Sequence, residues 1–222
     1  MKPQIKSDFG FYSILTDPVC GYDYLSNLLV ENEVAFLQLR MKDENKFKIL
    51  KTAENIRKIT QNSKTVFVIN DFIDIAKDCG ADGVHLGQDD EKPDTARMIL
   101  GKEAIIGLST HNLSQTKSAQ NEKIDYIGIG PVYPTPTKQI PDPVLGLGKM
   151  KEMLDVSKLP SVCIGGIEFD RIKTVLQAGA HNFCAVRLLN KSESPKKILR
   201  KIIKEYANYC IYGEKYTIFQ YS

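Results

Sequence analysis

Several charged side chains in this sequence directly follow short apolar runs, and their types suit chemistry on a bound polyanion. Arg40 and Lys42 follow one apolar run, Asp71 and Asp90 follow two later ones, and Lys138 lies beyond another. Guanidinium and ammonium groups bind pyrophosphate-like anions, whereas Mg2+ takes a small number of protein carboxylates and completes its shell with water and phosphate oxygens. Together these residues predict a site for a magnesium-bound pyrophosphate.

Each of these residues also has an ordinary structural interpretation. The two cations of the first run would pair on the surface with the acidic residues after them, Asp43 and Glu44. Asp71 would cap a helix beginning at Phe72, and Asp90 would be one of two acidic residues near the next helix. What favours a common site is the recurrence of such residues at the ends of consecutive runs.

A second anion site is indicated by Gly165 and Gly166, which follow the apolar run at 162–164. Glycines permit close backbone approach, and a phosphate often lies near the last two strands of a barrel enzyme. The loop TPTK at 135–138 adds two hydroxyls and an ammonium group. A plain tight turn and an undistinguished surface loop are the alternatives.

The sequence has three histidines, and two of them fall near strand ends. His85 lies inside an expected strand, so a hydrogen-bonded interior histidine is at least as good an interpretation as a catalytic base. His111 is a weaker candidate for a site residue. The histidines have no ligand-like spacing, which argues against zinc.

These residues need a scaffold that brings strand ends together. Short β-rich runs alternate with longer amphipathic stretches, and their continuous apolar character suits parallel strands buried on both faces. The expected strands are residues 11–16, 35–40, 65–70, 83–86, 104–108, 126–129, 161–164 and 182–188. Eight such units predict an α/β fold, a single (β/α)8 TIM barrel, with a doubly wound open sheet as the alternative.

Helix-like stretches fill the gaps between these strands. The helix expected at 46–62, for example, has an apolar face centred on Ile49, Ala53 and Ile56. The other expected helices are 72–79, 94–100, 169–178 and 196–209, with weaker candidates at 24–31, 114–121 and 148–154. The basic run within 196–204 fits the solvated face of the terminal helix better than a nucleic-acid patch.

Length and composition fit one domain covering residues 1–222, with the barrel at about 11–210 and a tail at 211–222. The net charge is only +3, and we expect neither a nucleic-acid nor a membrane partner. Five cysteines form no CxxC pair, and Cys163 and Cys184 lie in apolar runs, as reduced core thiols do. We therefore expect a cytoplasmic protein. The tail holds four aromatic residues and would dock on the barrel or on another copy in a homo-oligomer.

Six stretches, taken in order, resemble the thiamine phosphate synthase family. They are LQLRMK at 37–42, IND at 69–71, ADGVHLGQDD at 81–90, IGLSTH at 106–111, GPVYPTPTK at 130–138 and IGGI at 164–167. The resemblance runs from Phe11 to about Leu189. It implies an enzyme of thiamine biosynthesis, a transferase that joins a hydroxymethylpyrimidine diphosphate to a thiazole phosphate and releases pyrophosphate. The small-molecule substrates and Mg2+ would then be its partners and cofactor.

The resemblance also implies roles for particular residues. The diphosphate would be held by Gln38, Arg40, Lys42, Asn70 and Lys138, with Leu39 and Met41 in the same substrate-binding stretch, and Arg40, Lys42 and Lys138 would be catalytic. Asp71 and Asp90 would bind Mg2+, and Ser109 would contact the pyrimidine. The thiazole phosphate pocket would be lined by Thr135, Pro136, Thr137, Gly166, Val186 and Arg187.

The implied chemistry is dissociative: pyrophosphate leaves an electron-rich pyrimidine, and the thiazole nitrogen then attacks the methylene cation. Such a reaction needs charge stabilisation and positioning, which the predicted cations and Mg2+ would supply. One residue departs from the family pattern, because Arg187 stands where a serine usually holds the thiazole phosphate. It would bind the same phosphate by a longer reach, or the pocket would take a different ligand.

Three other functions remain open from the sequence. A thiazole tautomerase of the same family shares the barrel and phosphate pocket but needs no diphosphate clamp. A non-catalytic thiazole or thiamine phosphate binding protein would bind without turnover. Another barrel enzyme acting on phosphates would share Gly165 and Gly166 but not the complete set of residues at the strand ends.

Overall fold

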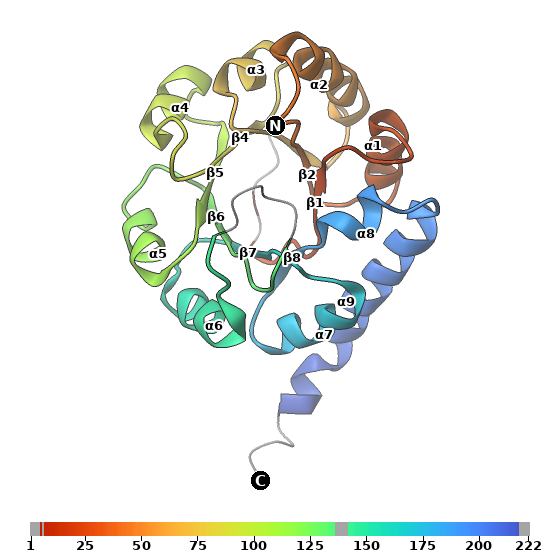
Figure 1. Ribbon diagram of the computed structural model, residues 1–222, viewed down its shortest axis with the longest axis vertical. Coiled ribbons are helices and arrows are strands. Elements are labelled where there is room, and N and C mark those ends of the chain that lie inside the picture. Colours follow the sequence, from red (N-terminus) through yellow and green to blue (C-terminus); the bar gives the residue numbers. More distant parts are fainter. Residues whose placement is uncertain (1–4, 6, 136–141, 218–222) are drawn as a thin grey trace.

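The computed structural model describes residues 5, 7–135 and 142–217 (Figure 1). Within these ranges the chain forms eight strands that alternate with helices along the sequence. The strands are β1 (Tyr12–Leu15), β2 (Phe36–Leu39), β3 (Val66–Asn70), β4 (Gly83–Leu86), β5 (Ile105–Thr110), β6 (Tyr126–Ile129), β7 (Ser161–Ile164) and β8 (Asn182–Cys184).

The strands form one parallel sheet in sequential order, from β1 to β8. A parallel bridge between Phe11 and Phe183 joins the last strand to the first, and Phe183 N–H donates to Gly10 O at 3.1 Å. The sheet therefore curves into a barrel with its helices outside (Figure 1). This confirms the predicted (β/α)8 barrel, and the open doubly wound sheet is excluded.

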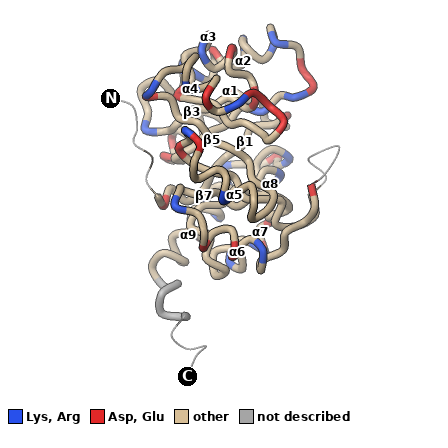
Figure 2. The backbone as a smooth tube through the Cα atoms, turned by 90° about the vertical axis from the view of Figure 1, so that its left-hand side faces the viewer, with Lys and Arg blue, Asp and Glu red and all other residues tan. Residues whose placement is uncertain are grey.

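The helices lie around the barrel, and each of them except α8 lies where the sequence predicts a helix. They are α1 (Tyr22–Glu31), α2 (Lys46–Thr60), α3 (Ile73–Asp78), α4 (Pro93–Leu100), α5 (Leu113–Ala119), α6 (Gly146–Val156), α7 (Phe169–Gln177), α8 (Val186–Asn190) and α9 (Pro195–Thr217). In α2 the residues that form the predicted apolar face, Ile49, Ala53 and Ile56, are buried. Figure 2 shows Lys and Arg interspersed with Asp and Glu over the molecule, in line with the small net charge.

Alternation along each strand divides the core into two layers, because successive side chains of a strand point to opposite faces. One apolar cluster includes Tyr12, Phe36 and Val68, whose side chains point into the barrel. A larger cluster includes Leu37 and Phe67, which point outward to the helices. Inward-pointing side chains at the carboxyl ends of the strands can therefore reach a common pocket.

The prediction of a strand over 182–188 is wrong in its second half. Strand β8 ends at Cys184, and Val186–Asn190 form α8. Asn190 fixes this helix to the end of β1: its Nδ2 donates to Ile14 O at 2.7 Å, and its Oδ1 accepts from Thr16 N–H at 2.9 Å. A short apolar run suits a strand or a buried helical turn equally well, and here these tertiary hydrogen bonds decide.

Helix α9 begins one residue before its predicted start and extends to Thr217, beyond the predicted end at Tyr209. Leu199 and Ile202 are buried against the barrel, whereas the basic residues of the predicted solvated face are all exposed: Lys196, Lys197, Arg200, Lys201 and Lys204. Part of the predicted tail is therefore helical, and residues 218–222 lie outside the described residues.

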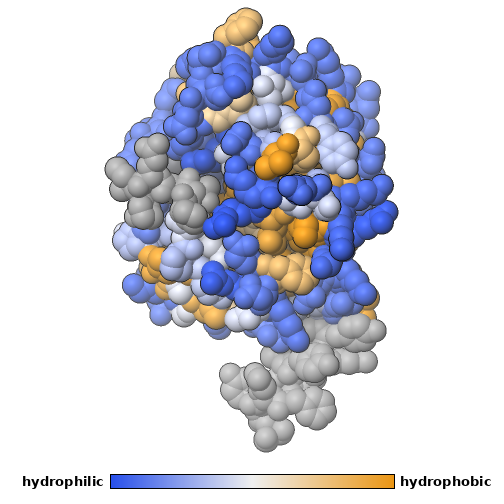
Figure 3. All heavy atoms as spheres, turned by 45° about the vertical axis from the view of Figure 1, so that its right-hand side comes forward, coloured by the Kyte–Doolittle hydropathy of each residue, from blue (hydrophilic) through white to orange (hydrophobic). Residues whose placement is uncertain are grey.

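Figure 3 shows that hydrophilic residues dominate one face of the molecule, with small groups of apolar residues between them.

Cys163 and Cys184 are buried free thiols, as predicted for core cysteines. Burial raises the pKa of the Cys163 thiol to about 12, so it stays protonated at neutral pH. Among the residues described, no helix has both the length and the apolar character needed to cross a bilayer.

Candidate active site

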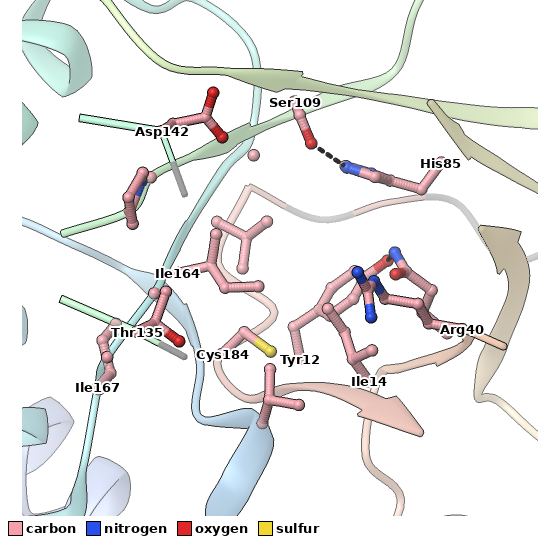
Figure 4. Close-up of a pocket in the computed structure, with 18 of the residues that line it drawn as sticks. Tyr12, Ile14, Arg40, His85, Ser109, Thr135, Asp142, Ile164, Ile167 and Cys184 are labelled. Carbon is pink, nitrogen blue, oxygen red and sulfur yellow. Dashed lines mark hydrogen bonds between the residues drawn. The ribbon is translucent and has the colours of Figure 1, made fainter. Parts of the chain in front are cut away.

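A cavity of about 370 Å3 opens at the carboxyl ends of the strands, where the charged residues of the sequence motifs gather. Residues from all eight strands or the segments after them line it, and Figure 4 shows part of this lining. Of the predicted site residues, the lining includes Gln38, Arg40, Lys42, Asn70, Asp71, Ser109, Thr135, Gly166, Val186 and Arg187. Active sites of barrel enzymes occupy this end of the fold.

Alternation along β2 decides which residues of the motif at 37–42 face the cavity. Gln38 and Arg40 point inward and line it. Leu39 and Met41 are buried in the outer apolar cluster, with 1% and 6% of their surfaces exposed. Their side chains support the barrel instead of lining the pocket, and the prediction that they contact substrate is not supported by this placement, because β2 turns every second residue toward the helices.

A network of opposite charges lies where β2 and β3 end. Lys42 Nζ is 3.0 Å from Asp71 Oδ2. Burial lowers the pKa of Arg40, while the neighbouring carboxylates of Asp71 and Asp43 act to raise it. An arginine remains cationic despite such a shift. This wall of the cavity therefore presents the Arg40 guanidinium together with the ion pair of Lys42 and Asp71.

The carboxylates of Asp71 and Asp90 meet at this same edge. Burial and a side-chain hydrogen bond with Asp90 raise the pKa of Asp71 to about 6, against the opposing effect of Lys42. Asp90 Oδ2 also accepts from Gly87 N–H at 2.6 Å, which fixes its position. Two carboxylates forced together in this way share a proton or a cation.

The donor set fits Mg2+, because oxygen ligands from one or two carboxylates, completed by water and phosphate oxygens, are typical for this ion. Asp71 has a positive φ of 66°, uncommon for a residue with a side chain, and its N–H donates to His85 O at 2.9 Å. The main chain is thus held in a conformation that brings its carboxylate next to that of Asp90. Among the described residues no group of three or more His, Cys, Asp or Glu forms a metal cluster.

Asn70 carries an unsatisfied donor on the wall of the cavity. Its side chain is buried, and its Nδ2 has no hydrogen-bond partner among the described residues. A buried polar group without a partner costs free energy, so such a group at a pocket wall points to a ligand acceptor.

The opposite side of the cavity is built around a glycine turn after β7. Gly165 and Gly166 have φ values of 100° and 62°, and a Cβ on Gly166 would lie 2.4 Å from Pro134 O. The turn therefore requires glycine, and its backbone faces the cavity without an intervening side chain. Such exposed backbone can approach a phosphate closely.

Arg187 lies beside this turn at the start of α8. Its side chain is 55% exposed, and its Nε lies 3.9 Å from Glu168 Oε1. This loose ion pair leaves the guanidinium able to reach an anion in the cavity. Arg171, which was not among the predicted site residues, donates to Gly166 O at 2.7 Å and lies over the Tyr133 ring, so it stabilises the turn.

Ser109 and His85 face the cavity from β5 and β4, and Figure 4 shows the hydrogen bond between them. Ser109 Oγ lies 2.9 Å from His85 Nε2. Ser109 belongs to β5 itself, which extends to Thr110, past the predicted end at Leu108. His111 reaches Gly130 O with its Nδ1 at 2.7 Å and lies 3.7 Å from Asp142.

Three predicted site residues, Pro136, Thr137 and Lys138, lie outside the described residues. Two others that line the cavity, Tyr12 and Glu168, were not among the predicted site residues. Tyr12 was hidden within an apolar run, and its only signal is its inward position on β1, two residues before Ile14. Glu168 follows the glycine turn and would need the turn's geometry to be recognised.

Two solved structures are similar to this chain in fold. A 3-hexulose-6-phosphate synthase structure has a TM-score of 0.63 with 14% sequence identity, covering 88% of this chain and 99% of that one. A thiamine phosphate pyrophosphorylase from Pyrococcus furiosus is nearer, with a TM-score of 0.82 and 25% identity, covering 91% of this chain and 97% of the other. Both are similar over almost the entire barrel.

Similarity in sequence favours the thiamine phosphate pyrophosphorylase over the 3-hexulose-6-phosphate synthase as a relative. A thiamine-phosphate synthase of Caldicellulosiruptor bescii is 37% identical over 182 residues, covering 81% of this chain and 83% of that protein. One from Persephonella marina is 39% identical over 196 residues, covering 86% and 93%. A family model described as thiamine monophosphate synthase matches residues 16–189, which include all six motifs. The resemblance inferred from those motifs is thereby confirmed, and the chain belongs to the thiamine monophosphate synthase family.

Proposed function

We propose that this protein is a thiamine-phosphate synthase, a transferase that joins a hydroxymethylpyrimidine diphosphate to a thiazole phosphate, giving thiamine phosphate and pyrophosphate. The observation that carries the proposal is the meeting of Arg40, Lys42 and Asp71 at one edge of a cavity that also has a glycine turn for a second anion. Asp90 does not line the cavity itself but is hydrogen-bonded to Asp71 at this edge. The names of its relatives support the same activity.

The diphosphate would lie against the ends of β2 and β3. Arg40 and Lys42 would bind its oxygens, and the unsatisfied Nδ2 of Asn70 would donate to one of them. Gln38 lines the same wall and is a further contact. By resemblance to the family, Lys138 would complete this set. These are the groups that the departing charge requires.

Asp71 and Asp90 would hold Mg2+ beside the diphosphate. When bound, Mg2+ would neutralise charge that accumulates on the leaving pyrophosphate. The hydrogen-bonded carboxylate pair and the pKa of Asp71 near 6 support this assignment, because a cation would replace the shared proton. Lys42, now paired with Asp71, would then be available to the diphosphate.

The reaction needs no protein nucleophile. The bond between the methylene carbon and the diphosphate oxygen breaks, and its electron pair leaves with pyrophosphate. The aminopyrimidine ring stabilises the resulting methylene cation, and the thiazole nitrogen supplies the pair for the new C–N bond. The protein's part is to stabilise the leaving oxygens, exclude water and hold the thiazole nitrogen in line.

The thiazole phosphate would lie at the glycine turn, held by the backbone at Gly166, by Thr135 and by the guanidinium of Arg187, with Val186 at its side. By resemblance, Pro136 and Thr137 would line the same pocket. Arg187 replaces the serine usual in the family, and its exposure gives it the reach to bind the phosphate. We place the reaction in the cytoplasm, a proposal supported by the free buried thiols of Cys163 and Cys184.

The decisive experiment mixes the purified protein with both substrates and Mg2+ and follows release of pyrophosphate. We expect release only when both substrates are present. Isomerisation of a thiazole carboxylate phosphate without pyrophosphate release would identify a tautomerase instead. Binding of either phosphate with no turnover would identify a binding protein, and both of these results would reject the proposal.

A further inference from the structure

A continuous chain of hydrogen bonds crosses the inside of the barrel beneath the cavity. Gln38 Nε2 donates to Tyr12 Oη at 2.8 Å, and Tyr12 Oη lies 2.8 Å from Tyr126 Oη. Tyr126 Oη lies 2.9 Å from His85 Nδ1, and His85 Nε2 lies 2.9 Å from Ser109 Oγ. The chain thus connects Gln38 on β2 to Ser109 on β5 through residues of β1, β6 and β4.

The direction of donation follows from the first bond. An amide nitrogen cannot accept a hydrogen bond, so the hydroxyl hydrogen of Tyr12 goes to its other described partner, Tyr126 Oη. The hydrogen of Tyr126 then goes to His85 Nδ1. An accepting Nδ1 carries no proton, so the proton of the neutral imidazole is on Nε2 and is donated to Ser109 Oγ.

Ser109 stands at the end of this chain as an acceptor from the histidine. Its Oγ has no other hydrogen bond among the described residues, and Ser109 lines the cavity. A hydroxyl has one hydrogen to donate, and here that hydrogen is left for a group in the cavity. A ligand atom beside Ser109 therefore meets a donor.

The barrel is built to hold the chain in place. Gly107 on β5 provides the room, because a Cβ there would lie 2.2 Å from Tyr126 Cζ and 2.5 Å from His85 Nδ1. Tyr12 stacks on Phe36 with ring centroids 5.1 Å apart, and Tyr126 packs on the same ring at 5.5 Å. Burial raises the pKa of the Tyr126 phenol well above its usual value, so it stays protonated and can donate.

We propose that Tyr12, Tyr126 and His85 are positioning residues that fix the hydroxyl of Ser109 as a hydrogen-bond donor toward an acceptor atom of the bound pyrimidine ring. The inference rests on the proposed function, together with the contact between Ser109 and the pyrimidine that the family resemblance implies. It adds that Gln38, at the diphosphate wall, sets the polarity of the group that meets the ring. One hydrogen-bond network thereby contacts both the diphosphate and the pyrimidine ring of the first substrate.

The direction of the chain can be measured without any activity. In the ligand-free protein labelled with 15N-histidine, the NMR signals of His85 would be assigned by substituting His111 and His181. We expect a neutral ring with its proton on Nε2. In Gln38→Glu a carboxylate can only accept, so the chain should reverse and the proton should move to Nδ1. A proton on Nδ1 in the unaltered protein, a doubly protonated ring, or no change in Gln38→Glu would overturn the proposal.

The role of the chain in positioning is tested by a double-mutant cycle. Tyr126→Phe should lower kcat/KM for the pyrimidine diphosphate by about tenfold, the effect of one hydrogen bond. In a Ser109→Ala background the same change should cost less than about twofold, because the group it orients is gone. Equal losses in both backgrounds would show that Tyr126 acts only through packing, and the proposal would fail.

Tyr206→Phe is the matched control, because it also removes a hydroxyl from a packed ring, which lies against Phe183 outside the cavity. We expect it to leave kcat/KM unchanged, and circular dichroism would check that every variant folds. A correct NMR result with no pyrophosphate release would reject the proposed function but leave the direction of the chain standing. Pyrophosphate release with the wrong tautomer would do the opposite.

Discussion

The ends of β2 and β3 present charged side chains to the cavity, whereas the ends of β7 and β8 present a glycine turn beside the exposed guanidinium of Arg187. At the first edge, Arg40 and Asp71 are partly buried, and their charges act on one another at short range. At the second edge, Arg187 is mainly in solvent and only loosely paired with Glu168. Buried charges act more strongly than exposed ones, because water screens the latter.

This difference matches what each edge would do in the proposed reaction. Charge builds up on a leaving diphosphate as its bond breaks, so fixed cations at that edge stabilise the transition state more than the bound substrate. A thiazole phosphate carries the same charge throughout, so binding it requires only affinity. Substitutions at the first edge should therefore change turnover, and those at the second edge should change KM.

The largest effect is expected from Arg40→Ala. Loss of this cation should lower kcat by about 100-fold or more, as removal of one charge-stabilising donor does in other enzymes. Lys138→Ala should behave in the same way if it joins the same edge. Pyrophosphate release under saturating substrates is the measurement, and Lys46→Ala is the control, since Lys46 pairs with Asp74 on the surface. Unchanged kcat in folded Arg40→Ala would refute the assignment of this edge.

Asp71→Asn should weaken activation by Mg2+. Loss of an indirect partner of a metal ligand typically costs about 10- to 100-fold in affinity, and loss of a ligand should cost at least as much. The Mg2+ concentration that gives half-maximal activity is the measurement. Asp89→Asn is a close control, because Asp89 is exposed and next to Asp90. An equal shift in both variants would mean that general surface charge, and not this carboxylate pair, attracts the ion.

Arg187→Ser restores the residue usual in the family and should raise KM for the thiazole phosphate by about tenfold. This is the lower range for a hydrogen bond to a charged group, chosen because the side chain is largely exposed. kcat and KM for the pyrimidine diphosphate should stay near their original values. A loss confined to kcat would place Arg187 with the leaving-group residues and erase the contrast between the two edges.

The smallest expected effect is on the pH dependence of stability, and it involves only the first edge, where Asp71 lies. The folded pKa of Asp71, about 6, lies above its ordinary value of 3.8, so the metal-free folded protein should lose stability as pH rises between these values. Mg2+ competes with the proton and should therefore raise Tm more at pH 7.5 than at pH 5. Asp71→Asn should remove both effects. Thermal denaturation measures each, and a Tm gain from Mg2+ that is independent of pH would contradict this account.

The sequence was sufficient to predict the barrel, because parallel strands buried on both faces leave continuous apolar runs that alternate with amphipathic helices. It also placed the polar residues at the strand ends. Where it failed, the deciding interactions were distant in the chain. The run at 182–188 became a helical turn in its second half because Asn190 bonds to the end of β1.

The hydrogen-bond chain could not be predicted in this way. Tyr12 and Tyr126 lie within apolar runs and look like core residues, which they also are. Their hydroxyls become informative only when closure of the barrel brings β1 and β6 within reach of one another. His85 was recognised as a candidate for an interior hydrogen-bonded histidine, and its partners were unknown until the strands were placed.

The alternation along β2 has a consequence for engineering. Gln38 and Arg40 face the cavity, while Leu39, between them, and Met41 pack against the helices. Residues that bind the ligand and residues that stabilise the fold thus alternate in one short segment. A library that randomises the whole segment would mix unfolded and inactive variants, whereas one that varies only the inward positions would explore new leaving groups on an intact scaffold.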